Sequence, residues 1–80
     1  MTTTDNIRSE HRSIYLNDLK AVLPEGKRIY FSFITYEDLS FLLISNIFAD
    51  NRSDALKQVL AVAADSLDEV YTISIQERKD

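Results

Sequence analysis

Apolar and polar positions follow a helical period in the first part of the chain. Between Ser9 and Leu23, apolar residues recur at the spacing of one helix face. These residues are Tyr15, Leu16, Leu19, Val22 and Leu23. Pro24 and Gly26 follow, and both residue types interrupt helices. We therefore expect a helix over 9–23, ended by a sharp turn at Gly26.

The pattern changes to strict alternation between Arg28 and Tyr36, where aromatic and β-branched residues dominate. Successive side chains of a strand point to opposite faces of its sheet. One face then carries Ile29, Phe31 and Phe33, and the other carries Tyr30, Ser32, Ile34 and Tyr36. We expect a strand over 28–36.

Residues 37–48 fit two structures. As a helix, the segment would begin with Thr35 as its N-cap and Asp38 in a capping position, and the absence of a hairpin-type Gly or Asn favours this choice. As a strand, it would pair with the preceding strand. A helix here would leave only two strands in the protein, and two strands make a marginal sheet. We therefore favour a strand.

The last third of the chain predicts one helix and one strand. Asn51 or Ser53 caps a helix over 54–67, whose apolar stripe is Leu56, Val59, Leu60, Ala63 and Leu67. A strand over 70–76 alternates between an inward and an outward set. The inward set is Tyr71, Ile73 and Ile75, and the outward set is Thr72, Ser74 and Gln76.

Together these elements predict an α+β fold in one small domain over 1–80, with element order α-β-β-α-β. The sheet would be three-stranded and mainly antiparallel, with both helices packed on one face. Residues 1–8 and 77–80 are expected to be frayed. The alternative, with residues 36–48 helical, is a two-stranded sheet with three helices.

Both faces of the predicted hairpin are apolar, which two helices on one side cannot cover. We expect the helices to cover Phe31, Phe33, Phe41, Leu43 and Ile47. The opposite face would then be an exposed partner surface, because monomers rarely leave such patches uncovered. It consists of Tyr30, Ile34, Tyr36, Leu42, Ile44 and Phe48. In the competing arrangement, one helix covers each face and no such surface exists.

The net charge of −4 comes from residues 36–69, where seven acids face only Arg52 and Lys57. Asp65, Asp68 and Glu69 would lie at the C-terminal end of the second helix, where the helix dipole disfavours acids. Together with Glu37 and Asp38, they indicate a docking surface for a protein partner with a basic surface. We expect no direct nucleic-acid binding, because too few cations are present to neutralise phosphates.

No residue pattern indicates catalysis. The chain has one histidine, one glycine and no cysteine, so thiolate metal sites and glycine-rich phosphate loops are excluded. Adjacent carboxylates point apart and do not converge on one target. We expect no catalytic residue, no metal, no cofactor and no enzyme activity. The N-terminus has no signal-peptide pattern and the longest apolar run is too short to span a bilayer, so we expect a cytoplasmic protein without membrane contact.

In size, acidity and absence of catalytic residues, the chain resembles the small inhibitor proteins of phages and mobile elements, such as anti-CRISPR proteins. The resemblance implies a non-catalytic protein-binding module that sterically blocks a host protein. Two other hypotheses remain: that the protein is a homodimeric accessory or structural subunit, and that it is an acidic DNA mimic.

Overall fold

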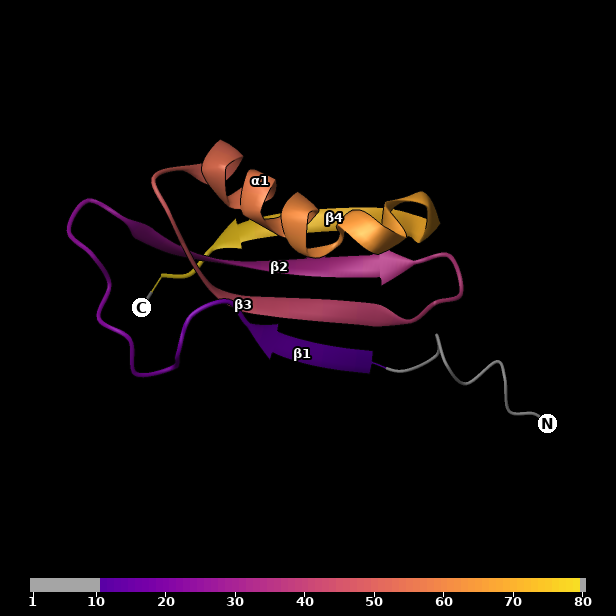
Figure 1. Cartoon of the computed structure of the whole chain (residues 1–80), viewed down its shortest axis with the longest axis horizontal. Coiled ribbons are helices and arrows are strands. Elements are labelled where there is room, and N and C mark those ends of the chain that lie inside the picture. Colours follow the sequence, from indigo (N-terminus) through magenta and orange to yellow (C-terminus); the bar gives the residue numbers. More distant parts are fainter. Residues whose placement is uncertain (1–10, 80) are drawn as a thin grey trace.

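Four strands form one sheet in the order β1-β3-β2-β4 in the computed structural model, which describes residues 11–79 (Figure 1). The strands are β1 (His11–Tyr15), β2 (Arg28–Tyr36), β3 (Phe41–Ala49) and β4 (Val70–Glu77). Between β3 and β4 lie the α-helix α1 (Arg52–Val62) and the 3-10 helix η2 (Ala64–Glu69).

The central strands β2 and β3 are a hairpin, and β4 pairs with β2 from the other side, also antiparallel. The edge strand β1 pairs with β3 in parallel. β3 and β4 therefore run in the same direction with β2 between them, and α1 crosses over β2 to connect them. This crossover brings α1 onto one face of the sheet, which we call the covered face.

Short polar side chains determine where the central elements begin and end. In the hairpin turn, Leu39 has a φ of 74°, and the Asp38 carboxylate accepts hydrogen bonds from the backbone N–H and hydroxyl of Ser40. At the start of α1, the side chain of Asn51 accepts a hydrogen bond from the backbone N–H of Asp54 at 2.9 Å. Asp54 in turn accepts one from the backbone N–H of Asp50, so orphan donors of the first turn are satisfied.

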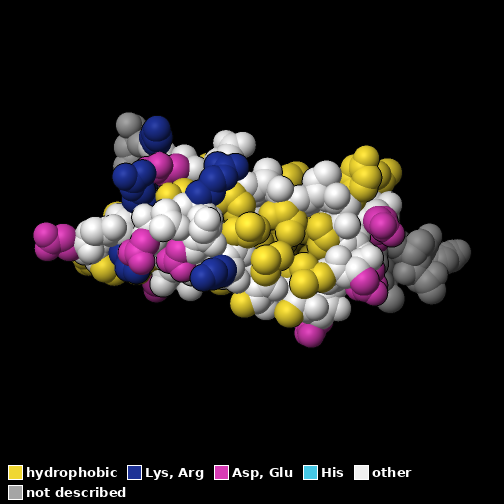
Figure 2. Space-filling view, turned by 90° about the horizontal axis from the view of Figure 1, so that it is seen from above, with side chains coloured by type: hydrophobic (Ala, Val, Ile, Leu, Met, Phe, Trp, Pro, Cys, Tyr) yellow, Lys and Arg dark blue, Asp and Glu magenta, His cyan; other side chains and the backbone are white. Residues whose placement is uncertain are grey.

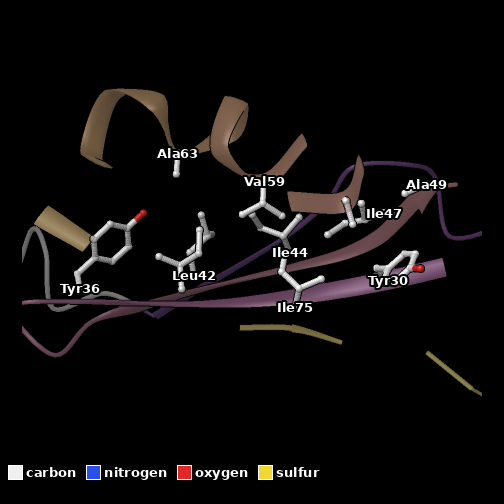
Figure 3. Close-up of a cluster of buried hydrophobic side chains, with 11 residues drawn as sticks. Tyr30, Tyr36, Leu42, Ile44, Ile47, Ala49, Val59, Ala63 and Ile75 are labelled. Atoms are coloured by element: carbon white, nitrogen blue, oxygen red, sulfur yellow. The ribbon is translucent and has the colours of Figure 1, made fainter. Parts of the chain in front are cut away.

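The core lies between α1 and the covered face (Figure 3). The helix contributes small side chains, namely Ala55, Val59 and Ala63, spaced one turn apart. Larger side chains from the sheet fill the space beneath them, and Ile34, Ile44 and Ile47 are fully buried. The remaining core residues are Tyr30, Tyr36, Leu42, Ala49 and Ile75.

The α+β class is confirmed, but the sheet has four strands and not three. The helix predicted over 9–23 is wrong within the described residues, because His11–Tyr15 is a strand and a loop follows it. Of its predicted apolar stripe, Leu16 packs against the core, but Leu19 is 66% and Val22 is 88% exposed. Pairing with the open edge of β3 overrides the local helical pattern.

The strand assignment for residues 41–49 is confirmed, and the helical alternative for 36–48 is wrong. The predicted helix over 54–67 is present as α1 followed by η2, and the last predicted strand is β4. Fraying of residues 1–8 concerns residues outside the described part of the chain. At the other end, Glu77 belongs to β4 and its carboxylate lies 3.4 Å from Arg28.

A β-bulge at Asn46 changes the facing of the end of β3. Asn46 has a φ of 56°, and the register between β2 and β3 shifts between Tyr30 and Ser32. The extra residue reverses the alternation beyond it. Ile47 therefore points into the core with Ile44, and Phe48 points to the opposite face with Leu43, whereas simple alternation grouped Ile47 with Leu43 and Phe48 with Ile44.

Candidate functional site

The face of the sheet that points away from α1, here called the open face, carries a group of large apolar side chains that lie outside the core. Its positions follow from the strand registers, which keep paired side chains on one side. The two central strands supply an apolar middle of Ile29, Phe31, Phe33, Phe41, Leu43 and Phe48. Phe33 is 38% exposed and the other five are half-buried.

Aromatic rings run across three strands of this face. The ring of His11 on β1 stacks on Phe41 of β3 at 4.1 Å between centroids, with an angle of 11°. Phe41 in turn stacks with Phe33 of β2 at 4.6 Å. This stacking keeps the three rings together on the outside of the sheet. The histidine of the chain therefore takes part in ring packing.

The polar residues of the open face are uncharged, and most of them lie on its two edge strands. The edge strand β1 contributes Ser13 and Tyr15, and β4 contributes Thr72, Ser74 and Gln76, while Thr35 and Ser45 lie on the central strands. No Asp, Glu, Lys or Arg occupies any of these strand positions within the described residues. An apolar middle surrounded by a polar rim is the arrangement found in protein interfaces.

All four phenylalanines of the chain lie on the open face, while Tyr30 and Tyr36 lie in the core beneath α1. The usual preference is the reverse, because phenylalanine is buried more often than tyrosine. Tyr36 reaches a partner there, since its hydroxyl is 3.1 Å from the Ser66 hydroxyl of η2.

The surface predicted from the sequence is therefore the covered face. Tyr30, Ile34, Tyr36, Leu42 and Ile44 are all less than 7% exposed, so their expected exposure is wrong. The predicted packing of two helices on one side is wrong, because only the second predicted helix is present among the described residues, as α1 and η2, and α1 covers the opposite side of the hairpin. Of the predicted apolar residues, only Phe48 lies on the open face, and it does so because of the bulge.

The five predicted acids lie at one end of the molecule. Glu37 and Asp38 are in the hairpin turn, and the backbone N–H of Glu37 donates to the carbonyl of Glu69 in η2 at 3.0 Å. Tyr36, Glu37, Asp38 and Glu69 line a shallow hollow of about 250 Å³. Asp65 and Asp68 are exposed on η2. Within residues 11–79, no three His, Asp or Glu side chains converge as a metal site would require.

The other end of the sheet carries basic residues. Lys27 and Arg28 begin β2, and the backbone N–H of Arg78 donates to the Ile29 carbonyl, so Arg78 and Lys79 lie at the same end. Lys27 pairs with Asp50 at 2.8 Å. Viewed from the side of α1 and β4, Lys and Arg side chains lie toward one end with Asp and Glu side chains among them, and the charged side chains toward the other end are acidic (Figure 2).

A second, smaller group of apolar side chains lies on the outer side of α1 and η2. Leu56 is 38%, Leu60 is 37% and Leu67 is 43% exposed, although the helical stripe predicted them in the core. Figure 2 shows apolar side chains gathered in the middle of this side. The helix turns its smallest residues to the sheet because the covered face is already filled by large side chains.

Sequence reasoning missed Phe31, Phe33, Phe41 and Leu43 as surface residues. No local signal identifies them, because both faces of the hairpin are apolar.

Comparisons with protein-family models, with characterised proteins and with solved structures found no significant match to this chain. Within the described part of the chain, no helix has the length and apolar character needed to cross a membrane.

Proposed function

We propose that the protein is a non-catalytic protein-binding module that docks through the open face of its sheet. The observation that carries this proposal is the aromatic middle of that face, which gathers every phenylalanine of the chain outside the core. Aromatic side chains are enriched in interface cores because each buries a large area with few rotatable bonds.

The physical cost of leaving this face in water supports the proposal. Burying one phenylalanine contributes about 1.5–3 kcal/mol relative to leaving it exposed. Phe33 and Phe41 stack on each other, and Phe31, Phe41 and Phe48 are half-buried, so only part of that gain remains for a partner. Even so, a partner that covered them would gain several kcal/mol from apolar burial alone.

The structure of the rim restricts the chemistry of the contact. The open face offers hydroxyl and amide groups at its edges, so its centre attracts no charged partner. Charge acts only at the ends of the sheet, where the acids of the hairpin turn and η2 favour basic groups on the partner. The module acts by occupying a surface, either as a steric blocker of a host protein or as an accessory subunit.

A comparison of two matched variants tests the proposal. Phe33 on the open face and Leu56 on α1 are both 38% exposed, so Phe33→Lys and Leu56→Lys remove similar exposed apolar groups on opposite sides. Quantitative capture from the source cell, with the wild type and both variants as bait, should retain one partner with the wild type and Leu56→Lys only. The partner is then confirmed with the purified components by calorimetry. If nothing that the wild type retains depends on Phe33, while circular dichroism shows both variants folded, the open face is not the binding surface.

A further inference from the structure

We infer that the occupant of the open face is a second copy of this chain, stacked face to face and antiparallel across a two-fold axis that lies between the sheets, perpendicular to the strands. This inference rests on the proposed function, because it names the partner of the same surface.

The arrangement of side chains across the sheet is self-complementary. The order is a polar edge, two apolar strands and a second polar edge. A two-fold axis perpendicular to the strands lays each strand over its own copy, so apolar middle meets apolar middle and edge meets edge. Hydroxyl groups such as those of Ser13 and Ser74 both donate and accept hydrogen bonds, so such a rim pairs with itself without a complementary charge.

Charge distribution selects the antiparallel arrangement of the two copies. The turn that follows β2 and the η2 helix carry acids at one end of the sheet, namely Glu37, Asp38, Asp65, Asp68 and Glu69. Lys27, Arg28, Arg78 and Lys79 lie at the other end, where Asp50 pairs with Lys27 and Glu77 pairs with Arg28, so that end is mixed in charge. Antiparallel stacking places the acidic end of each copy near this mixed end of the other, whereas parallel stacking would bring the two acidic ends together. Because the middle of the face carries no charge, the net charge of −4 is not concentrated in the contact.

The area of the face is sufficient for a dimer. β2 and β3 have nine residues each, β4 has eight and β1 has five. At about 3.3 Å per residue and about 4.8 Å between strands, they cover a plane of roughly 490 Å² per copy, or about 1,000 Å² for two. A biological interface should exceed about 1,000 Å² of buried accessible surface, and stable ones usually bury about 1,200–2,000 Å². The plane area lies at the lower of these limits, and the relief of the side chains adds to it.

Sedimentation equilibrium over a concentration series tests the inference directly. The chain has a mass of 9.2 kDa, and the wild type should reach twice that mass as its concentration rises. Phe33→Lys should raise the dissociation constant by at least about thirtyfold, the effect of losing an interface hot spot. Leu56→Lys should leave it unchanged. Ser74→Lys, which adds a charge at an exposed position beside Phe33, should also weaken the dimer, so the test does not depend on one variant folding.

Single cysteines test the antiparallel geometry without ambiguity, because the chain has no cysteine of its own. Ser45 is the middle residue of β3 and lies on the open face, so the two-fold axis places it opposite its own copy. Thr35 lies on the same face near the acidic end and would be far from its copy. A bis-maleimide cross-linker long enough to bridge the gap of about 10 Å between stacked sheets should therefore link Ser45→Cys into a covalent dimer and leave Thr35→Cys monomeric in denaturing electrophoresis.

A wild type that stays at the monomer mass up to about 0.5 mM overturns the inference, as does a dimer that Phe33→Lys and Ser74→Lys leave intact while both remain folded. Equal cross-linking of the two cysteine variants overturns the antiparallel arrangement. A monomeric wild type that captures a different protein in a Phe33-dependent manner overturns the inference and leaves the proposed function standing.

Discussion

Replacing Asn46 by alanine should destabilise the protein more than its position near the end of a strand suggests. Asn46 is 7% exposed, and its side-chain amide nitrogen donates to the carbonyls of Asn17 and Asp18, both at 3.3 Å. The side chain of Asn17 returns a hydrogen bond to the Asn46 carbonyl at 2.7 Å. The bulge is thus tied to the loop that follows β1, and the variant loses the two bonds that Asn46 donates.

The magnitude follows from two contributions. Each lost hydrogen bond costs about 0.5–1.5 kcal/mol, and the carbonyls left behind are partly buried. The φ of 56° adds about 1 kcal/mol for alanine, because asparagine visits the left-handed region more readily than residues with a plain Cβ. The total is about 3 kcal/mol, which lowers the melting temperature of a domain of this size by roughly 12–24 °C.

Asn46→Gly separates the two contributions. Glycine adopts positive φ without strain but makes no side-chain hydrogen bond, so this variant should lose about 1 kcal/mol less than Asn46→Ala. Urea unfolding followed by circular dichroism measures all three proteins. Equal stability of the alanine and glycine variants would refute the strain contribution, and a loss below about 0.5 kcal/mol in both would refute the role of the amide.

Two further predictions concern single polar side chains. The Ser32 hydroxyl is 1% exposed and has no hydrogen-bond partner among the described residues, so Ser32→Ala should raise the free energy of unfolding by about 1 kcal/mol; a loss of stability in urea contradicts this. The hydrogen bond from Lys27 to Asp50 raises the pKa of Lys27 above its usual value of 10.5, so its contribution to stability is present below pH 10.5 and is lost as the pH rises through the higher folded-state pKa. Between pH 9 and pH 11.5, the urea midpoint should therefore decrease more in the wild type than in Lys27→Met. An equal decrease in both proteins refutes the assignment.

The strands with clear alternation could be predicted from sequence because their signal is local. β2 and β4 and the helix after Asn51 appear where the pattern places them. β1 could not be predicted, since its pairing with β3 in parallel joins residues about 30 positions apart and leaves no local period. The bulge could not be predicted either, because no neighbouring residue indicates the positive φ of Asn46.

The side of the hairpin that α1 covers depends on topology rather than on residue type. Both faces of β2 and β3 are apolar, so burial preference does not choose between them. The choice follows from the crossover: connections between parallel strands of one sheet are right-handed in nearly all proteins. Once β4 is known to lie beyond β2, that rule places α1 on the face of Ile34 and Ile44 and leaves Phe33 and Leu43 outside. The strand order, which determines the face that α1 covers, does not follow from the sequence pattern.

The residues chosen for the two faces then carry the functional argument. Within residues 11–79, one helix and one short 3-10 segment cover a single side of the four-stranded sheet. Solubility alone would favour polar residues on the other side of the sheet. The outward positions of β4 are of this kind, namely Thr72, Ser74 and Gln76. The central strands instead present phenylalanines there and place Tyr30 and Tyr36 inside. Apart from the hydrogen bond between Tyr36 and Ser66, a folded monomer gains little from that exchange, because its core would hold phenylalanine at least as well. The exchange is explained when the open face is buried in its turn against another protein surface.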